Sequence, residues 1–190
     1  ILTPRKIDEF DVRGNYYLVC EYIEGGSLES LLDHGKMSIE DALDISIDIV
    51  HLVLKVHDAG FAWRDCKPAN LLMDAQGKLY AIDFEGACYI DDRRESPWGS
   101  PGYLIPKVTD MELSDRWRFQ DVYAVGATIH HSLTGRMPLS DASLPPVGKL
   151  RRGIPSVVRK LLGGVLSGNP KRMPNLRDLA AGLEEGRRMV

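Results

Sequence analysis

Four polar residues near the middle of the chain have the types and the spacing that phosphoryl transfer requires. Asp65, Lys67 and Asn70 lie in one short stretch, and Asp83 follows after a predicted hairpin. A carboxylate, a cation and an amide held together can orient a proton, neutralise phosphate charge and contribute oxygen ligands to a metal ion. The spacing therefore predicts one site that is built from two neighbouring loops.

Each of these side chains has a distinct expected role. Asp65 would accept or orient the proton of the attacking hydroxyl, and Lys67 would neutralise charge that develops on the transferred phosphate. Asn70 and Asp83 would supply oxygen ligands to Mg²⁺, which usually keeps water and substrate phosphates at its remaining positions. Taken singly, each residue also suits an ordinary turn, cap or solvated surface. Their order in one strand-loop-strand context favours the catalytic interpretation.

A short hairpin is predicted between the two halves of this site. Residues 71–73 and 79–82 are β-type runs, and they flank a turn in which Gly77 is available for a positive φ. Pairing of the two runs returns the chain to its starting point. The hairpin would therefore bring Asn70 and Asp83 together.

The pattern around the site is mostly helical. Ser38 followed by Asp41 is typical of an N-cap with an acidic first turn, and a polar stripe at helical spacing continues to Lys55. The run 121–133 is almost wholly apolar and ends before Gly135, which predicts a central buried helix. Further helices are expected at residues 156–166 and 176–183, and residues 136–153 are Pro-rich and loop-like.

Composition bounds the class of protein. The chain has 190 residues, 44% of them hydrophobic, and a net charge of −3, so one domain with one sizeable core is expected. This charge gives no reason to expect nucleic acid or an anionic membrane surface as a partner. No apolar run approaches the roughly 20 residues of a membrane span, and no N-terminal signal pattern is present. The cysteines lack metal-ligand spacing, which favours free thiols in a reducing cytoplasm.

Several separate stretches resemble the large lobe of eukaryotic-like protein kinases. Residues 17–28 resemble the last small-lobe strand and the hinge. The other matching stretches are residues 99–103 at the end of the activation segment, 121–126 at the start of the central helix, and 169–174 before the last helix. The resemblance implies a mainly α fold, the kinase C-terminal lobe, with a short β-hairpin at the active site. Residues 1–24 would form the last small-lobe strands and the hinge, and residues 25–190 the helical lobe.

The same resemblance implies ATP and Mg²⁺ as cofactors. It puts Cys20 at the gatekeeper position beside adenine, with the Glu21 carbonyl and the Ile23 N–H on the purine edge. Leu72 would lie beneath the ring, and Ser27 would complete the nucleotide site. Ser or Thr is the expected acceptor, because a lysine two residues after the catalytic Asp resembles the Ser/Thr kinases.

Two elements that such an enzyme needs are missing from the sequence: a Gly-rich loop over the phosphates, and a strand lysine paired with a helix glutamate. Residues 4–9 lack a strand pattern, so Lys6 is interpreted as a solvated surface lysine. Together with a start at Ile1 rather than at Met, this favours an excised large lobe that is inactive alone. Its small lobe is expected as a partner within the same polypeptide.

Three departures from the kinase pattern bear on activity. Trp63 stands where His is usual, and Glu85 stands where Gly is usual. Lys107 replaces a Glu that normally pairs with the arginine matched here by Arg172, and Glu112 is a substitute partner for that arginine.

Trp63 and Glu85 narrow the resemblance to the kinase domain of class III and class IV lanthipeptide synthetases. This implies a Ser/Thr-containing precursor peptide as substrate, with lyase and cyclase domains as partners. One alternative is a stand-alone bacterial Ser/Thr protein kinase, and another is a pseudokinase module that binds nucleotide or a partner protein without transferring phosphate. Small-molecule kinases usually lack the Lys-Pro-x-Asn run and the Gly-Ser-Pro-Gly-Tyr segment that this chain contains.

Overall fold

The computed structural model describes residues 3–35, 37–92, 98–106, 115–139 and 144–190. Lys107, which replaces the expected glutamate partner of Arg172, lies outside the described residues, and so does Glu112, the predicted substitute partner. Arg172 itself is exposed.

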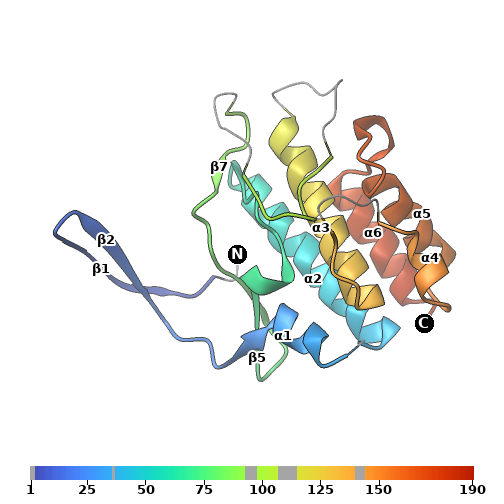
Figure 1. Ribbon diagram of the computed structural model, residues 1–190, viewed down its shortest axis with the longest axis horizontal. Coiled ribbons are helices and arrows are strands. Elements are labelled where there is room, and N and C mark those ends of the chain that lie inside the picture. Colours follow the sequence, from blue (N-terminus) through green and yellow to red (C-terminus); the bar gives the residue numbers. More distant parts are fainter. Residues whose placement is uncertain (1–2, 36, 93–97, 107–114, 140–143) are drawn as a thin grey trace.

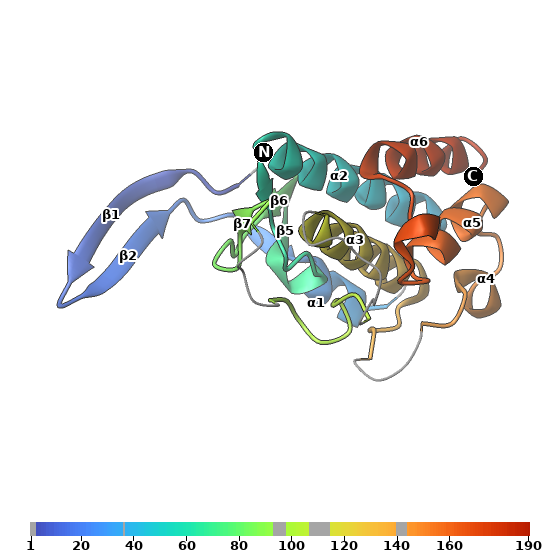
Figure 2. The same ribbon diagram turned by 90° about the horizontal axis from the view of Figure 1, so that it is seen from above.

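Four helices form the body of the molecule. They are α2 (Ile39–Asp58), α3 (Arg116–Thr134), α5 (Ser156–Val165) and α6 (Leu176–Arg187). α3 packs against α2 and α5, and α6 packs against α2 and α5, so α3 is enclosed by its neighbours (Figures 1 and 2). Every residue of α3 from Gln120 to Thr134 is buried, which confirms the predicted central helix.

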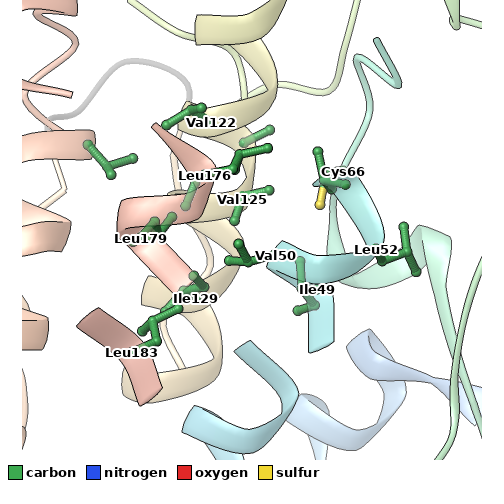
Figure 3. Packing of buried hydrophobic residues seen from close by; sticks show 14 of the residues in the cluster. Ile49, Val50, Leu52, Cys66, Val122, Val125, Ile129, Leu176, Leu179 and Leu183 are labelled. Carbon is green, nitrogen blue, oxygen red and sulfur yellow. The ribbon is translucent and has the colours of Figure 1, made fainter. Parts of the chain in front are cut away.

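Apolar side chains from α2, α3 and α6 meet in one core (Figure 3). The side chains that the figure labels are Ile49, Val50 and Leu52 from α2, Val122, Val125 and Ile129 from α3, Leu176, Leu179 and Leu183 from α6, and Cys66 from the loop after α2. α5 approaches α3 closely because residue 126 is glycine: a Cβ there would lie 2.3 Å from Cγ1 of Val165. Burial of this apolar surface is the main stabilising contribution to the helical body.

The helix ends follow the sequence signals. The Ser38 hydroxyl accepts a hydrogen bond from the Asp41 N–H at the start of α2. Gly135 ends α3 in the left-handed conformation, with φ +67°. α3 begins at Arg116, one turn earlier than the apolar run indicated, because its first turn carries polar residues. α4 (Val147–Leu150), a single turn, lies in the segment that was predicted to be loop.

Short elements surround the predicted site. β3 (Gly25–Ser27), β5 (Leu71–Asp74) and β6 (Leu79–Ala81) form an antiparallel sheet in the order β3-β5-β6. β4 (Phe61–Ala62) pairs with β7 (Cys88–Tyr89). α1 (Leu28–Asp33) follows β3, and the 3₁₀ turns η1 (Pro68–Asn70) and η2 (Pro170–Arg172) complete the elements. The hairpin β5–β6 is the one predicted from residues 71–82.

A second hairpin projects away from the helical body (Figures 1 and 2). It consists of β1 (Lys6–Val12) and β2 (Asn15–Cys20), and every residue in both strands is exposed. The prediction that residues 4–9 form no strand was therefore wrong. Their pattern is irregular because the register of β1 against β2 shifts between Lys6 and Asp8, which breaks the alternation on which a strand prediction depends.

Among the described residues, helices of sufficient length carry too many polar side chains to cross a lipid bilayer.

Candidate active site

The loop that follows α2 is attached to α3 through one buried carboxylate. Oδ1 of Asp121 accepts a hydrogen bond of 2.7 Å from the Arg64 N–H, and Oδ2 accepts one of 2.8 Å from the Trp63 N–H. Nε2 of His57 lies 2.8 Å from the same Oδ2 and donates to it, because a carboxylate can only accept. Asp121 is fully buried, so all of these donors are satisfied without water.

Arg64 has a strained backbone at this attachment point. Its φ of +74° lies in the left-handed region, which a residue with a Cβ adopts at a cost of roughly 1–3 kcal/mol. The hydrogen bond from its N–H to Asp121 holds it there. The side chain of the next residue, Asp65, is thereby directed by a backbone that α3 fixes.

Asp65, Lys67 and Asn70 meet as the sequence predicted. Nζ of Lys67 lies 2.9 Å from Oδ2 of Asp65, and it donates a second hydrogen bond of 2.6 Å to the hydroxyl of Ser100. Nδ2 of Asn70 donates to the same Oδ2 and to the backbone carbonyl of Asp65, both at 3.0 Å. One oxygen of Asp65 is therefore shared by a cation and an amide.

The other oxygen of Asp65 is different. Within the part of the chain that the structure describes, Oδ1 of Asp65 is buried and has no hydrogen-bond partner. A buried carboxylate oxygen without a donor is unfavourable by about 1–3 kcal/mol or more, and such atoms in folded proteins usually mark a ligand or a catalytic role. The orphaned oxygen indicates where a hydroxyl group would donate its hydrogen.

The hairpin β5–β6 returns Asp83 to the neighbourhood of Asn70. The Ile82 N–H donates a 3.0 Å hydrogen bond to the Asn70 carbonyl at the open end of the hairpin. Asp83 has φ +60° and is exposed. Its carbonyl accepts a 3.0 Å hydrogen bond from Nε1 of Trp63, and the Trp63 ring stacks on Phe84 with centroids 5.3 Å apart. Trp63 therefore joins the two loops by both packing and a polar contact.

These residues fit a magnesium ion that is held mainly by substrate phosphates. Asn70 uses Nδ2 for its hydrogen bonds to Asp65, so Oδ1 of Asn70 and the carboxylate of Asp83 are the oxygen donors that the two loops offer to a metal ion. Within the described residues, no group of three or more His, Cys, Asp or Glu side chains is arranged to hold a metal ion. This donor set suits Mg²⁺, which commonly uses one or two protein ligands together with phosphate oxygens and water.

The residues expected at adenine are only partly brought together. Ser27 pairs with Leu72 across β3 and β5, and the Ser27 hydroxyl accepts from the Ser30 N–H, so it caps α1. Cys20 is exposed at the end of β2. The Glu21 N–H donates to the Arg5 carbonyl at 2.9 Å. Ile23 is half-buried beside it.

A segment that carries Ser100 is also fastened to α3. The Tyr103 hydroxyl lies 3.0 Å from Nδ1 of His131. Burial raises the pKa of Tyr103 and lowers the pKa of His131, so both are neutral near pH 7 and the hydroxyl donates to the imidazole. Gln120 donates to the Tyr103 carbonyl at 3.1 Å and accepts from the Ile105 N–H at 3.0 Å.

Sequence reasoning did not assign Gln120, His131 or Tyr103 to the site. The available signal was the presence of polar residues in an otherwise apolar helix, since a buried polar side chain requires a partner. A further member of this group is Thr128, whose hydroxyl donates a 3.2 Å hydrogen bond to the carbonyl of Cys66. Burial raises the pKa of the Cys66 thiol well above its usual value, so this cysteine contributes packing rather than a thiolate.

The chain is similar in sequence to a known protein family over most of its length. Residues 5–165 match the family model described as the protein kinase domain. Citron rho-interacting kinase of Rattus norvegicus is 33% identical over 147 residues, which are 70% of this chain and 7% of that protein. CBL-interacting serine/threonine-protein kinase 15 of Arabidopsis thaliana is 29% identical over 171 residues, 83% of this chain and 40% of that protein. The cAMP-dependent protein kinase catalytic subunit PRKX of Homo sapiens is 33% identical over 126 residues, 66% of this chain and 35% of that protein. The chain thus spans less than half the length of each of these relatives.

The attachment through Asp121 can be tested by a conservative substitution. In Asp121→Asn an N–H₂ group replaces one acceptor oxygen and faces either a backbone N–H or His57. We expect the free energy of unfolding to fall by about 1–3 kcal/mol, the cost of leaving a buried donor unsatisfied. Chemical denaturation followed by circular dichroism measures this change.

Asp58→Asn is the matched control, because Asp58 is an exposed carboxylate whose partner is Arg177. Substitution there should change the free energy of unfolding by no more than about 0.5 kcal/mol. Equal effects of the two substitutions would show that Asp121 does not hold the loop.

Proposed function

Because this chain belongs to the protein kinase domain family, we propose that it transfers the γ-phosphoryl group of ATP to Ser and Thr hydroxyls with the help of Mg²⁺. The relatives named above that carry a specificity in their names include a serine/threonine-protein kinase. The observation that carries the proposal is the orphaned Oδ1 of Asp65, which is buried beside a carboxylate oxygen already satisfied by Lys67 and Asn70.

This asymmetry suits an acceptor hydroxyl. Oδ2 of Asp65 is occupied by two donors, so Oδ1 is the oxygen that can accept a hydrogen bond from an incoming hydroxyl and orient its lone pair for attack. Nζ of Lys67 lies within reach of both the Asp65 carboxylate and the Ser100 hydroxyl. A cation at that point stabilises the charge that develops on the transferred group.

Mg²⁺ and ATP would be held by the residues around this acceptor position. Oδ1 of Asn70 and the carboxylate of Asp83 would bind the metal ion, and Cys20, Glu21, Ile23, Ser27 and Leu72 would bind the nucleotide. When bound, ATP·Mg²⁺ supplies the phosphoryl group and neutralises part of its charge. The chain's own contribution is to fix the acceptor hydroxyl and the developing charge in one geometry.

We further propose that the chain is a C-terminal lobe and that a small lobe of the same polypeptide covers its projecting hairpin. Residues 1–24 would be the last strands of that small lobe with the hinge, and residues 25–190 the helical lobe. The support is the exposure of large apolar side chains on the hairpin, including Ile7 at 57%, Tyr16 at 65% and Leu18 at 55%. Such surfaces are normally covered. Without the covering lobe the chain would lack half of its nucleotide cleft and would be inactive. We also propose that the whole protein is cytoplasmic.

Substitutions of the two carboxylates separate their roles. In the full-length protein, Asp65→Asn should lower kcat by about 10²–10⁴-fold with little change in the KM for ATP, because it removes the acceptor oxygen and not the nucleotide contacts. Asp83→Asn should remove most of the Mg²⁺-dependent turnover, because it removes a metal ligand. Steady-state assays with varied ATP and Mg²⁺ measure both effects.

Asp58→Asn again provides the control, since this exposed carboxylate lies at the end of α2. It should leave kcat and KM unchanged. Turnover by Asp65→Asn and Asp83→Asn equal to that of the wild type would rule out the roles proposed for these two carboxylates. Nucleotide binding by the wild type without any phosphate transfer would favour a pseudokinase module.

At a finer level we propose that the substrate is a lanthipeptide precursor and that lyase and cyclase domains belong to the same protein. The support is the resemblance carried by two residue types: Trp63, which is fully buried and donates to the Asp83 carbonyl, and Glu85, two residues after Asp83 in the sequence. The competing proposal is a stand-alone bacterial Ser/Thr protein kinase.

A peptide assay distinguishes these two proposals. With ATP and Mg²⁺, the full-length lanthipeptide enzyme should convert a Ser/Thr/Cys-rich peptide with an attached leader segment into phosphorylated, then dehydrated, then thioether-bridged products. Asp65→Asn should abolish dehydration of the unphosphorylated peptide and still permit elimination from a chemically phosphorylated one, because elimination takes place on another domain. Mass spectrometry follows each product. Phosphorylation of general protein substrates without any dehydration would favour the stand-alone kinase.

A further inference from the structure

Trp117, in the first turn of α3, makes contacts that no step of the proposed reaction uses. Its side chain is 2% exposed. The Arg64 guanidinium carbon lies 4.2 Å from the centroid of its ring, within the range of a cation–π contact. Its Nε1 donates a 2.8 Å hydrogen bond to the Asp92 carbonyl. A buried indole is therefore held on its edge and covered on a face by the arginine that precedes Asp65.

Trp117 and Asp121 act on the same residue from the same helix face. They are four residues apart on α3, and side chains at this spacing lie one above the other. Asp121 binds the Arg64 backbone N–H, and Trp117 packs against the Arg64 guanidinium. Arg64, whose backbone is left-handed, is thus restrained through its backbone N–H and through its side chain.

The surroundings of Trp117 join the two loops of the site. Its ring packs in a small apolar cluster with Ala62 of β4 and with Cys88 and Ile90 in and after β7. β4 leads directly into Trp63 and Arg64, and β7 follows the Asp83 segment. Trp117 therefore packs against the strand that leads into Arg64 as well as against the Arg64 side chain itself.

We propose that Trp117 is a positioning residue for phosphoryl transfer, which holds Arg64, and through it Asp65, in the acceptor-binding geometry. This inference rests on the proposed function. Its physical basis is that a strained residue persists only when its surroundings over-determine it, and that a small misplacement of a reacting group lowers the rate strongly.

A double-mutant cycle in the full-length protein tests the proposal. Trp117→Leu should lower kcat by about 10–100-fold and leave the KM for ATP within about twofold, since the loss is one of positioning. In an Arg64→Met background, which has no guanidinium to hold, the same substitution should lower kcat by no more than about twofold. A purely structural role of Trp117 predicts equal losses in both backgrounds, and that result would overturn the proposal.

Two further variants identify the contact. Trp117→Phe keeps an aromatic face and should retain kcat within about fivefold of the wild type, because phenyl rings also attract cations, although less strongly than indole. Arg116→Ala removes the other cation over the ring, whose carbon lies 4.7 Å from the centroid, and should leave kcat unchanged. If Trp117→Leu does not fold, the cycle is run with Trp117→Phe, where any loss must again vanish in the Arg64→Met background. A loss that persists there would overturn the proposal.

Hydrogen exchange separates this inference from the proposed function, because it requires no turnover. The Arg64 amide, which is bonded to Asp121, should exchange at least tenfold faster in Trp117→Leu, while amides in the middle of α3 keep their wild-type rates. If the wild-type protein transfers no phosphate, the proposed function fails and this measurement alone decides the inference. An unchanged exchange rate at Arg64 would overturn it.

Discussion

The arrangement of the site depends on one buried carboxylate. Asp121 is fully enclosed and accepts hydrogen bonds from two consecutive backbone N–H groups and from His57. These donors belong to the end of α2 and to the loop after it, whereas Asp121 belongs to α3. The polar contact therefore sets the position of the loop relative to the helical core, a task that non-directional apolar packing cannot perform. Asp65 inherits its direction from this attachment.

α3 serves as the platform for the whole site because its buried surface is not wholly apolar. Trp117, Asp121, Thr128 and His131 of α3 each contact a loop residue, and Asp121 also accepts a hydrogen bond from His57 of α2. The loops carry strained or irregular backbone, including positive φ at Arg64 and Asp83. A rigid helix in the core can hold such conformations, since its own position is fixed by apolar contacts on several sides. The apolar contacts that stabilise the core thus also fix the geometry of the site.

The proximity of the predicted site residues could be inferred from the sequence, because it depends on residue type and local spacing. Asp65, Lys67 and Asn70 meet within one loop, and the β5–β6 hairpin returns Asp83 as its turn residues indicated. The helix caps at Ser38 and Gly135 were equally local signals. The four main helices followed from periodicity for the same reason.

The supporting contacts could not be predicted in this way, because their partners are distant in the sequence. Nε1 of Trp63, for example, bonds to the Asp83 carbonyl, 20 positions away. The pairing of Trp117 with Arg64 carries no local pattern, and the strand β1 has an irregular register that conceals its alternation.

The most direct test of the account is phosphoamino acid analysis of a peptide or protein incubated with the full-length enzyme, ATP and Mg²⁺. The account predicts Mg²⁺-dependent phosphate on Ser or Thr, whereas phosphate mainly on Tyr, or no transfer at all, would contradict it.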